Sequence, residues 1–382
     1  MLDLNKSYKP NSELQEDAAS SQKNVIFSFF SGAGFLDLGF EKAGFEVVFV
    51  NELDSSFMGA YKHSRSVMGH KSPKYGYHEN SIDDYLNNSD DCFLRDSVDT
   101  ERNNGNLIGF IGGPPCPDFS VGGKNKGKDG ENGKLSKSYA ECIKRYNPDW
   151  FVFENVKGLW RTKKHREFYE SLKLELIGAG YFLNDRLINS LEYGVPQDRD
   201  RIILFGIKNS ISKSIKKDFP WEENMTYPNR TAFDFNWPNK SPFGNKDTIP
   251  DGIPSELTVQ YWFDKNSVPL HPNSNDHFTP RAGLPKFMSI EEGDTSKKSY
   301  KRLHRYRYSP TAAYGNNEVH LHPVEPRRLS AAEAMAIQSL PKEFELPKSM
   351  TLSAMFKTIG NGVPYLFSYG IAKTIKDHLG TK

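Results

Sequence analysis

Short apolar runs alternate with amphipathic stretches between residues 24 and 208 of this 382-residue chain. This rhythm is typical of a doubly wound α/β sheet, in which buried strands alternate with helices. The pattern predicts strands at 24–30, 46–51, 107–112, 149–154 and 201–207. It predicts helices at 35–43, 138–146 and 166–178.

The texture of the chain changes between residues 209 and 325, where Pro, Asn, Trp, Tyr and Lys are interspersed and periodic apolar stretches are few. We expect a loop-rich second domain there. Regular patterning returns at Ser330–Leu340, which opens with the capping-box pattern Ser-x-x-Glu. A last helix is predicted from Pro364 to His378, because proline is favoured at the first helical position. Residues 1–23 are expected to form a flexible arm.

Composition, with 37% hydrophobic and 26% charged residues, is that of a globular protein. The net charge of +2 does not indicate a nucleic-acid partner, so charge has to be judged locally. No apolar run reaches the roughly 20 residues that span a bilayer, and the polar first residues lack the apolar core of a signal peptide. We therefore expect a cytoplasmic protein without a membrane segment.

The predicted strand 24–30 leads directly into a glycine-rich turn, FSGAG at 30–34, and then into a helix. Glycines at such a turn let a ligand approach the backbone closely. Glu52 ends the next strand, 20 residues after Gly32, and can accept hydrogen bonds from both hydroxyls of a ribose. The turn alone is as often purely structural, and it matches neither the dinucleotide pattern nor the P-loop. Together with Glu52 it favours a nucleoside without a pyrophosphate, of which S-adenosylmethionine is the common case.

Cys116 stands in the segment GGPPCPDFS (112–120), directly after an apolar run. Prolines on both sides exclude a helix and restrict φ, which predicts a rigid loop at the carboxyl end of a central strand. Ligands bind at that edge of open α/β sheets. A free cysteine is usually a small buried hydrophobe, and we assign Cys92 and Cys142 to that class. The prolines favour a reactive role for Cys116, and three widely spaced cysteines fit neither a zinc site nor a disulfide framework.

The predicted strand 149–154 ends at Glu154, which places this carboxyl on the same sheet edge as Cys116. Farther along, QDRDR (197–201) leads into an apolar strand. Arg199 and Arg201 are two residues apart and point to one face of an extended chain. Salt bridges with the neighbouring aspartates remain the alternative for Arg199.

Seven blocks of the sequence resemble, in order, those of the bacterial cytosine-5 DNA methyltransferases. They are FSGAGFLDLGFEKAGF, the acidic Glu52, GGPPCPDFS, FVFENV, YGVPQDRDRIILFGI, RRLSAAEAMAIQSLP and IGNGVP. One block would be weak evidence, whereas seven in order are highly specific. The resemblance implies a Rossmann-like α/β methyltransferase fold that uses S-adenosylmethionine. It also implies a discontinuous catalytic domain, 24–208 plus 326–382, with 209–325 inserted as a smaller target-recognition domain.

The resemblance implies a role for each matching residue. Cys116 is the implied nucleophile, Glu154 is the acid beside it, and Arg199 and Arg201 support the site and contact the target base. The implied cofactor contacts are Phe30, Gly32, Gly34, Glu52, Leu53, Ile82, Pro115, Leu135, Asn361 and Val363. One departure is Ser81, which stands where the family usually offers an aspartate to the adenine amino group.

The implied reaction begins when a cytosine is flipped out of duplex DNA. The Cys116 thiolate adds to carbon 6 while Glu154 assists at ring nitrogen 3, and carbon 5 then becomes nucleophilic enough to take a methyl group. Arg201 is expected to hold the ring oxygen. No metal is required, and no ligand cluster is evident in the sequence.

Two basic segments are the predicted DNA contacts. Residues 121–135 contain five glycines and four lysines, and form either a disordered linker or a lid whose lysines meet phosphates on closing. Residues 300–308 interleave basic and tyrosine side chains, and form either a solvated surface or a phosphate-binding one. The side chains assigned to DNA are Ser120, Lys124, Lys126, Arg302, Arg305 and Arg307.

Duplex DNA is the expected partner, a cognate restriction endonuclease is a possible functional partner, and a monomer is the expected state. Two alternatives stay open: the same chemistry on RNA, and a DNA-binding relative that has lost catalysis. The long insertion favours a sequence-reading DNA enzyme, and the intact set of Cys116, Glu154 and Arg201 favours catalysis. An amino-directed methyltransferase would need an Asp/Ser/Asn-Pro-Pro-aromatic block, which the sequence lacks.

Overall fold

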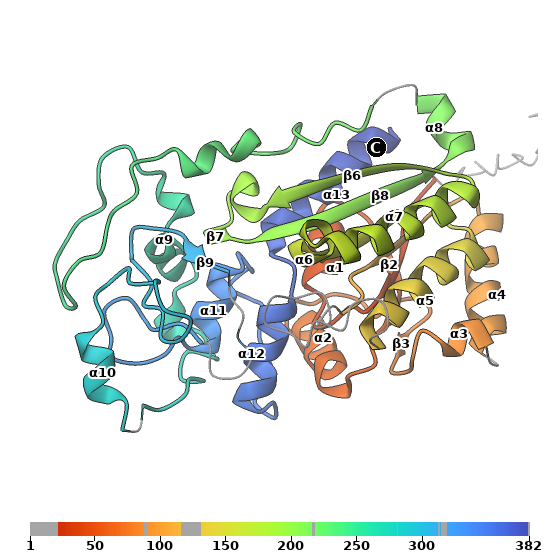
Figure 1. The fold of residues 1–382 in the computed structure, drawn as a ribbon. Coiled ribbons are helices and arrows are strands. Elements are labelled where there is room, and N and C mark those ends of the chain that lie inside the picture. Colours follow the sequence, from red (N-terminus) through yellow and green to blue (C-terminus); the bar gives the residue numbers. More distant parts are fainter. Residues whose placement is uncertain are drawn as a thin grey trace, which may run out of the picture.

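The computed structural model describes residues 22–87, 90–115, 131–215, 218–280, 282–311, 314 and 319–380. Within these residues, seven strands form one sheet in the order β3-β2-β1-β4-β5-β8-β6 (Figure 1). The strands are β1 (Asn24–Phe29), β2 (Glu46–Asn51), β3 (Tyr77–His78), β4 (Leu107–Gly112), β5 (Trp150–Val156), β6 (Tyr181–Asn189) and β8 (Asp200–Lys208). The first five in this order run parallel, whereas β8 is antiparallel to both of its neighbours. The fold is therefore the predicted Rossmann-like α/β class.

Helices cover both faces of this sheet. Alternate side chains of β1 point to opposite faces, so Phe27 packs into one core cluster and Ile26 into another. On the first face lie α4 (Asp90–Asn103), α5 (Glu131–Tyr146) and α7 (Lys163–Gly178). On the second face lie α1 (Phe35–Lys42), α2 (Ser55–Val67) and α13 (Tyr365–Leu379). Burial on both faces explains why these strands read as nearly continuous apolar runs.

Most of the predicted elements are confirmed, with shifts at their ends. The bounds of β2 and β4 agree with the prediction, while β5 runs on to Val156 and α5 begins at Glu131. Helix α11 (Ala331–Ile337) has the predicted capping box, in which Ser330 and Glu333 each accept from the other's backbone N–H. Helix α13 begins one residue later than predicted, because Pro364 is its N-cap.

The C-terminal helix returns to the N-terminal part of the chain. Helix α13 packs against α1, and the Ser368 hydroxyl donates to the carbonyl of Leu36. A side chain at Gly39 would meet Ser368 at 2.4 Å, so glycine permits this close approach. The last helix is thus part of the layer that covers β1.

Between residues 209 and 325 the chain is mostly irregular. In the described part of this segment the α-helices are α8 (Asn209–Ile215), α9 (Val259–Lys265) and α10 (Leu284–Ser289), and 3₁₀ helices span Pro228–Phe233, Ser255–Leu257 and Val268–Leu270. A short strand, β9 (Ser309–Pro310), pairs with β7 (Gln197–Asp198) in a two-stranded sheet. The part of this segment that contains α9, α10 and β9 lies beside α11 and α12 (Leu352–Asn361), at the end of the molecule opposite α4, whereas α8 lies against β6 and β8 (Figure 1).

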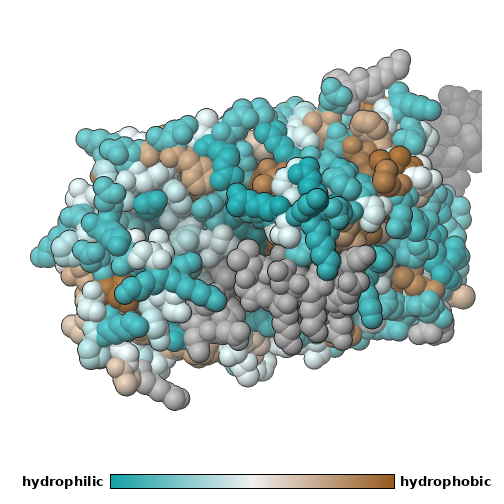
Figure 2. Space-filling view, viewed as in Figure 1, coloured by the Kyte–Doolittle hydropathy of each residue, from teal (hydrophilic) through white to brown (hydrophobic). Residues whose placement is uncertain are grey.

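The surface seen in Figure 2, in the same orientation, is largely hydrophilic, with apolar side chains in small scattered groups. None of the helices in the part of the chain that the structure describes is both long and apolar enough to cross a membrane. The remaining short helices are α3 (Asp84–Asn87) and α6 (Lys157–Arg161).

Candidate active site and cofactor pocket

The predicted site residues gather at one edge of the sheet. The parallel strands β1, β2, β4 and β5 end there, and they lead into the glycine turn, Glu52, the segment 113–115 and Glu154 respectively. Strand β8 runs the other way and begins at this edge, with Arg201 opposite Val156. The topology thus brings together residues that are up to 171 positions apart in sequence, from Phe30 to Arg201.

The glycine turn has the backbone conformation that its sequence suggested. Gly32 and Gly34 have φ values of 56° and 79°, which a side chain rarely tolerates, and Phe30 also has a positive φ of 54°. The amide of Gly32 donates to Glu52 Oε2 at 2.8 Å. A Cβ at Gly32 would have open space around it, so the outer side of this turn is accessible to a ligand.

A buried polar network supports the turn from behind. Arg65 donates to the carbonyl of Gly34 at 2.7 Å, pairs with Glu41 at 2.9 Å and stacks on the ring of Tyr61. Tyr61 donates to Asp37 at 2.9 Å, and Asp37 is fully buried. Burial raises the pKa of Asp37 to about 6. Sequence reasoning missed this network, because nothing in the spacing of Asp37, Tyr61 and Arg65 marks them as partners.

Glu52 and Leu53 have the properties that a nucleoside requires. Glu52 is partly buried, burial raises its pKa, and its carboxylate also accepts from the amide of Asp54 at 2.8 Å. These bonds to N–H groups fix the carboxylate while lone pairs remain for ribose hydroxyls. The side chain of Leu53 is 66% exposed, which is unusual for leucine and offers an apolar face for an adenine ring. The residues present therefore fit S-adenosylmethionine.

Ile82 and Leu135, two further predicted cofactor contacts, belong to the same core region but differ in accessibility. Ile82 is only 2% exposed within the core cluster, so its contact with adenine stays a prediction, whereas Leu135 is half-buried beside that cluster. At the departure from the family pattern, the amide of Ser81 donates to Asp84 at 3.1 Å. Asp83 accepts from Ser138 of α5 at 2.5 Å. Both nearby carboxylates thus already have partners.

The IGNGVP block lies against the first helix. A Cβ at Gly362 would come within 2.1 Å of the Phe35 ring, so only glycine allows this contact. Asn361 is exposed and Val363 is 6% exposed. The buried Arg199 donates from Nη2 to the carbonyls of Gly360 and Gly362, each at 2.9 Å. Arg199 therefore holds the segment that carries two of the predicted cofactor contacts.

Glu154 and Arg201 form a buried ion pair at the end of β5. Arg201 Nε lies 2.8 Å from Glu154 Oε1, and both residues are less than 10% exposed. Burial raises the pKa of Glu154, while the charges of Arg201 and Arg199 act in the opposite direction. A Cβ at Gly113 would lie 2.7 Å from Glu154 Oε2, so the chain that leads to Cys116 passes directly over this carboxyl.

Several predicted residues lie outside the part that the structure describes. They are Cys116, Ser120, Lys124 and Lys126. The described chain stops at Pro115, which is exposed, and Asn155 donates to the carbonyl of Pro114 at 3.4 Å. The neighbour of Cys116 in sequence is thus held at the edge that carries Glu154.

The structure contradicts the predicted DNA contact of Arg302, whereas that of Arg305 stays a prediction. Arg302 is fully buried, and its guanidinium donates to the carbonyls of Ile290, Phe287, His322 and Glu325. Arg305 is bound by the buried carboxylate of Glu292 at 2.9 and 3.1 Å. A loop-rich segment has many backbone carbonyls and a buried acid to satisfy, and these cations do so. Arg307 is only partly buried and stacks beside Tyr308, so its contact with DNA stays a prediction.

Comparison with known proteins shows the family to which this chain belongs. The family model described as C-5 cytosine-specific DNA methylase matches residues 25–377. The chain belongs to this family. It is accordingly a DNA cytosine-5 methyltransferase that takes its methyl group from S-adenosylmethionine.

Curated relatives agree with this family, and a solved structure shares the fold. The methyltransferase is 60% identical over 358 residues to type II methyltransferase M.NmeDI of Neisseria meningitidis serogroup C, which covers 94% of this chain and 84% of the relative. It is 30% identical over 369 residues to type II methyltransferase M.FnuDI of Fusobacterium nucleatum, covering 94% and 95%. The fold is similar to that of S. pombe Dnmt2 methyltransferase, with a TM-score of 0.58, 12% identity, and coverage of 93% and 99%.

Two cations near the site were not singled out from the sequence. Lys157 directly follows the FVFENV block, and Arg230 belongs to the segment 209–325. Both pair with the buried Asp200, Arg230 at 2.8 Å. Their side chains are 31% and 47% exposed. The position of Lys157 could have been inferred from its block, whereas Arg230 has no sequence signal.

Proposed function

We propose that Cys116 is the nucleophile of this methyltransferase and that Glu154 and Arg201 bind the flipped cytosine. The observation that carries the proposal is the buried Arg201–Glu154 pair, over which the chain leading to Cys116 passes. A carboxyl group with a raised pKa can share a proton with ring nitrogen 3 near neutrality. Arg201 pairs with one carboxylate oxygen of Glu154, and it is therefore close enough to donate a hydrogen bond to the carbonyl oxygen of the cytosine ring.

Each of these groups has a defined task in the reaction. A bond forms between the Cys116 sulfur and carbon 6, while nitrogen 3 takes a proton or hydrogen bond from Glu154. The electron pair displaced from the C5–C6 double bond makes carbon 5 nucleophilic. After methylation, the proton on carbon 5 passes to a base such as water, its bonding pair re-forms the C5–C6 double bond, and the S–C6 bond breaks to return the Cys116 thiolate. S-adenosylmethionine, when bound, would supply the electrophilic methyl group and leave as S-adenosylhomocysteine.

The proposed cofactor pocket consists of the glycine turn, Glu52, Leu53 and the segment 361–363. Glu52 accepts from the ribose hydroxyls, and the positive φ values at 32 and 34 leave the backbone approachable. Arg199 is a positioning residue in this proposal, because its Nη2 donates to the backbone carbonyls of Gly360 and Gly362. Arg201, by contrast, is assigned to the flipped cytosine.

For the DNA, we propose that residues 209–325 recognise the target sequence and that 24–208 plus 326–382 form the catalytic domain. Phosphate contacts are assigned to Lys157, Arg230 and Arg307. The first two pair with Asp200 at the start of the active-site strand β8, and the side chains of both are partly exposed. Lysines 124 and 126 remain proposed contacts of a closing lid.

Biologically, we propose that the enzyme modifies host DNA in a restriction-modification system, as a cytoplasmic monomer with a cognate endonuclease as functional partner. Support comes from relatives named type II methyltransferases over nearly the whole chain. Sedimentation of the protein alone and with a short duplex measures its oligomeric state.

The test is to express the enzyme and its Cys116→Ala variant in a host without DNA methylation and to bisulfite-sequence the plasmid. We expect protected cytosines within one short motif for the enzyme and none for the variant. Turnover by the variant contradicts the assignment of Cys116. Soluble protein that protects no cytosine in either form, but methylates RNA, would instead favour the RNA alternative.

A further inference from the structure

A run of basic residues directly follows the FVFENV block that contains Glu154. Residues 157–166, KGLWRTKKHR, contain three lysines, two arginines and no aspartate or glutamate. The whole chain has a net charge of only +2, so the remainder of the chain is net negative. The five cations, which we call the α6–α7 basic surface, are Lys157, Arg161, Lys163, Lys164 and Arg166. The last four are exposed, and the first is partly exposed.

Apolar side chains fix this surface on the body of the protein. Leu159 of α6 is fully buried in the same core cluster as Phe168 of α7. The ring of Trp160 lies edge-on to that of Tyr169, with centroids 6.2 Å apart, and the Arg166 guanidinium lies 4.0 Å from the centre of the Trp160 ring. Figure 2 shows strongly hydrophilic side chains gathered where Figure 1 places α6 and the start of α7. The two helices thus present their cations to solvent from an anchored position.

The protein itself compensates little of this positive charge. Among the residues that the structure describes, no carboxylate pairs with Arg161 or Lys163. Arg166 lies 3.8 Å from Glu170, within its own helix. Lys163 stands in the first turn of α7, where the helix dipole disfavours a cation and no acidic residue offsets it. Positive charge is therefore concentrated here against the local preference of the helix, which favours an external anion as its partner.

The surface begins at the active-site edge and extends only a short way from it. Val156 pairs with Arg201 in the sheet and is followed directly by α6. From Val156 to Arg166 the chain consists of two helical pieces joined by the extended residue Thr162, so it spans at most about 17 Å. At roughly 3.4 Å per base pair, this length corresponds to about five base pairs of duplex. Phosphates within that distance of a cytosine bound at Glu154 are the ones that the surface can reach.

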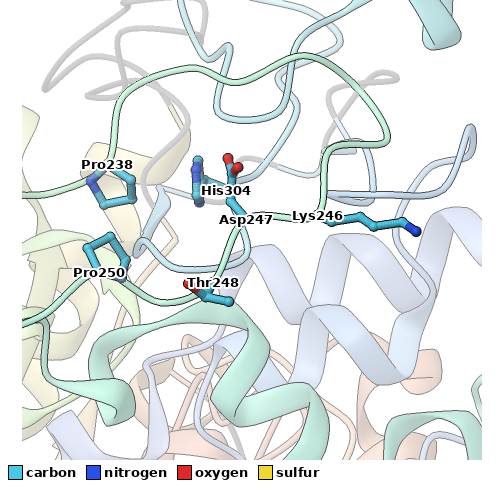
Figure 3. A pocket seen from close by; sticks show the side chains of 6 residues that line it. All are labelled: Pro238, Lys246, Asp247, Thr248, Pro250 and His304. Atoms are coloured by element: carbon cyan, nitrogen blue, oxygen red, sulfur yellow. The ribbon is translucent and has the colours of Figure 1, made fainter.

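Neighbouring surfaces are less suited to phosphate. Beyond its first turn, α7 carries Glu167 and Glu170, which line a groove of about 460 Å³ along this helix. In the segment 209–325, a pocket of about 400 Å³ is lined by the exposed Asp247, and the Lys246 side chain extends away from the other lining residues (Figure 3). Carboxylates in both places repel phosphate. The uninterrupted positive charge thus ends at the first turn of α7.

We propose that the α6–α7 basic surface binds the phosphates of the duplex that flanks the target cytosine. It extends the proposed phosphate contact of Lys157 to two exposed cations, Arg161 and Lys163, that lie farther from the base. Phosphates occur in every sequence, so these contacts strengthen DNA binding without selecting a motif. The inference rests on the proposed position of the cytosine at Glu154 and Arg201.

The test neutralises the two cations that no described carboxylate pairs with. Arg161→Gln/Lys163→Gln removes two charges from the surface, and Lys213→Gln/Lys373→Gln removes two from exposed positions on α8 and α13 as a matched control. Binding of a labelled duplex that carries the methylated motif is measured by fluorescence anisotropy over a range of salt concentrations, with S-adenosylhomocysteine present. A second duplex has uncharged methylphosphonates within about five base pairs of the cytosine, the reach of the surface.

We expect the slope of log affinity against log salt concentration to fall in magnitude by about 2 for Arg161→Gln/Lys163→Gln, since each lost phosphate contact accounts for about 1. The control should keep the wild-type slope. Affinity for the motif and for its single-base changes should weaken by the same factor, and turnover at saturating DNA should stay close to wild type. On the methylphosphonate duplex, the difference between wild type and variant should largely disappear.

An unchanged salt slope in the variant overturns the proposal, and so does a loss no larger than that of the control, which would reflect net charge alone. A difference that persists on the methylphosphonate duplex also overturns it, because the cations would then act without contact. Both positions are exposed, so urea unfolding should match wild type; if the double variant unfolds, Lys163→Gln alone should lower the slope by about 1. Failure of the proposed function is distinguishable, because Cys116→Ala would then retain methylation whatever the salt slopes are.

Discussion

Arg199 and Arg201 are two residues apart, yet the structure predicts that their loss affects different steps. Arg199→Met removes the donor to the carbonyls of Gly360 and Gly362, and each stranded carbonyl costs roughly 1–3 kcal/mol. Removing a buried cation also recovers several kcal/mol of desolvation, which offsets most of this cost, so we expect the free energy of unfolding to fall by no more than about 3 kcal/mol. Arg201→Met leaves Glu154 without its ion-pair partner instead.

The functional consequence of Arg199→Met should appear in cofactor binding. The carbonyls that it holds flank Asn361 and lie next to Val363, both proposed cofactor contacts. A loosened segment is expected to weaken binding about tenfold to hundredfold, which corresponds to roughly 1.4–2.8 kcal/mol. At saturating cofactor, turnover should be close to that of wild type. Arg201→Met should bind cofactor normally and lose about 10²–10⁴-fold in turnover, the range for removing assistance to proton transfer or charge stabilisation.

The assay pairs titration calorimetry with S-adenosylhomocysteine and single-turnover methylation of a duplex at saturating cofactor. Urea unfolding of both variants reports whether each remains folded at the assay temperature. Unchanged cofactor affinity in Arg199→Met together with lost turnover would place Arg199 at the base and refute the positioning role. Arg199→Lys is a useful intermediate, because a single ammonium cannot reproduce the geometry of the guanidinium.

Other substitutions test the remaining parts of the site. Glu154→Gln should reduce turnover about 10²–10⁴-fold without changing cofactor affinity; wild-type turnover in single-turnover assays would exclude the acid role. Gly34→Ala should abolish cofactor binding in calorimetry, because its φ is 79° and the new Cβ meets the Tyr61 ring at 2.4 Å; intact binding contradicts the proposed turn. Leu53→Ala should raise the KM for cofactor severalfold and leave stability within about 0.5 kcal/mol, as measured by kinetics and urea unfolding. Asp37 has a folded pKa of about 6 against 3.8 unfolded, so its protonation favours the folded state and its contribution is lost as pH rises from about 4 to 6. The difference of ~2 pH units, at 1.36 kcal/mol each, is about 3 kcal/mol, and Asp37→Asn should remove this part of the pH dependence of urea unfolding; parallel wild-type and variant curves exclude it.

The parallel strands could be predicted because their limits are set by local chemistry. β4 is an apolar run that ends at Gly112, before Gly113 and two prolines, and β2 ends at the polar Asn51, before Glu52. β6 was not predicted, since most of its residues are only partly buried and its alternation is correspondingly weak. Helix α5 begins earlier than predicted because the polar stretch that starts it carries no apolar period.

Within the site, strand ends located Glu52 and Glu154, but the partners of buried charges could not be inferred. The alternation of basic and tyrosine residues at 300–308 suggested a surface, whereas Arg302 is buried among backbone carbonyls. Charge in a sequence shows only that a partner is needed; whether that partner is a phosphate or a carbonyl depends on how the loops fold. For the same reason, the hydrogen bond from Arg65 to the carbonyl of Gly34 could not be predicted from the sequence.

Three consecutive residues, 199–201, connect the parts of this enzyme. Arg199 holds the segment next to the proposed cofactor contacts, and Arg201 pairs with the proposed acid. Between them, Asp200 binds Lys157 and, across the boundary of the inserted segment, Arg230. The side chain of Asp200 points away from those of Arg199 and Arg201, because neighbouring side chains of an extended chain point to opposite faces. A movement of Arg230 in the segment 209–325 would therefore act on Asp200, and through one stretch of backbone on the proposed contacts of the base and the cofactor.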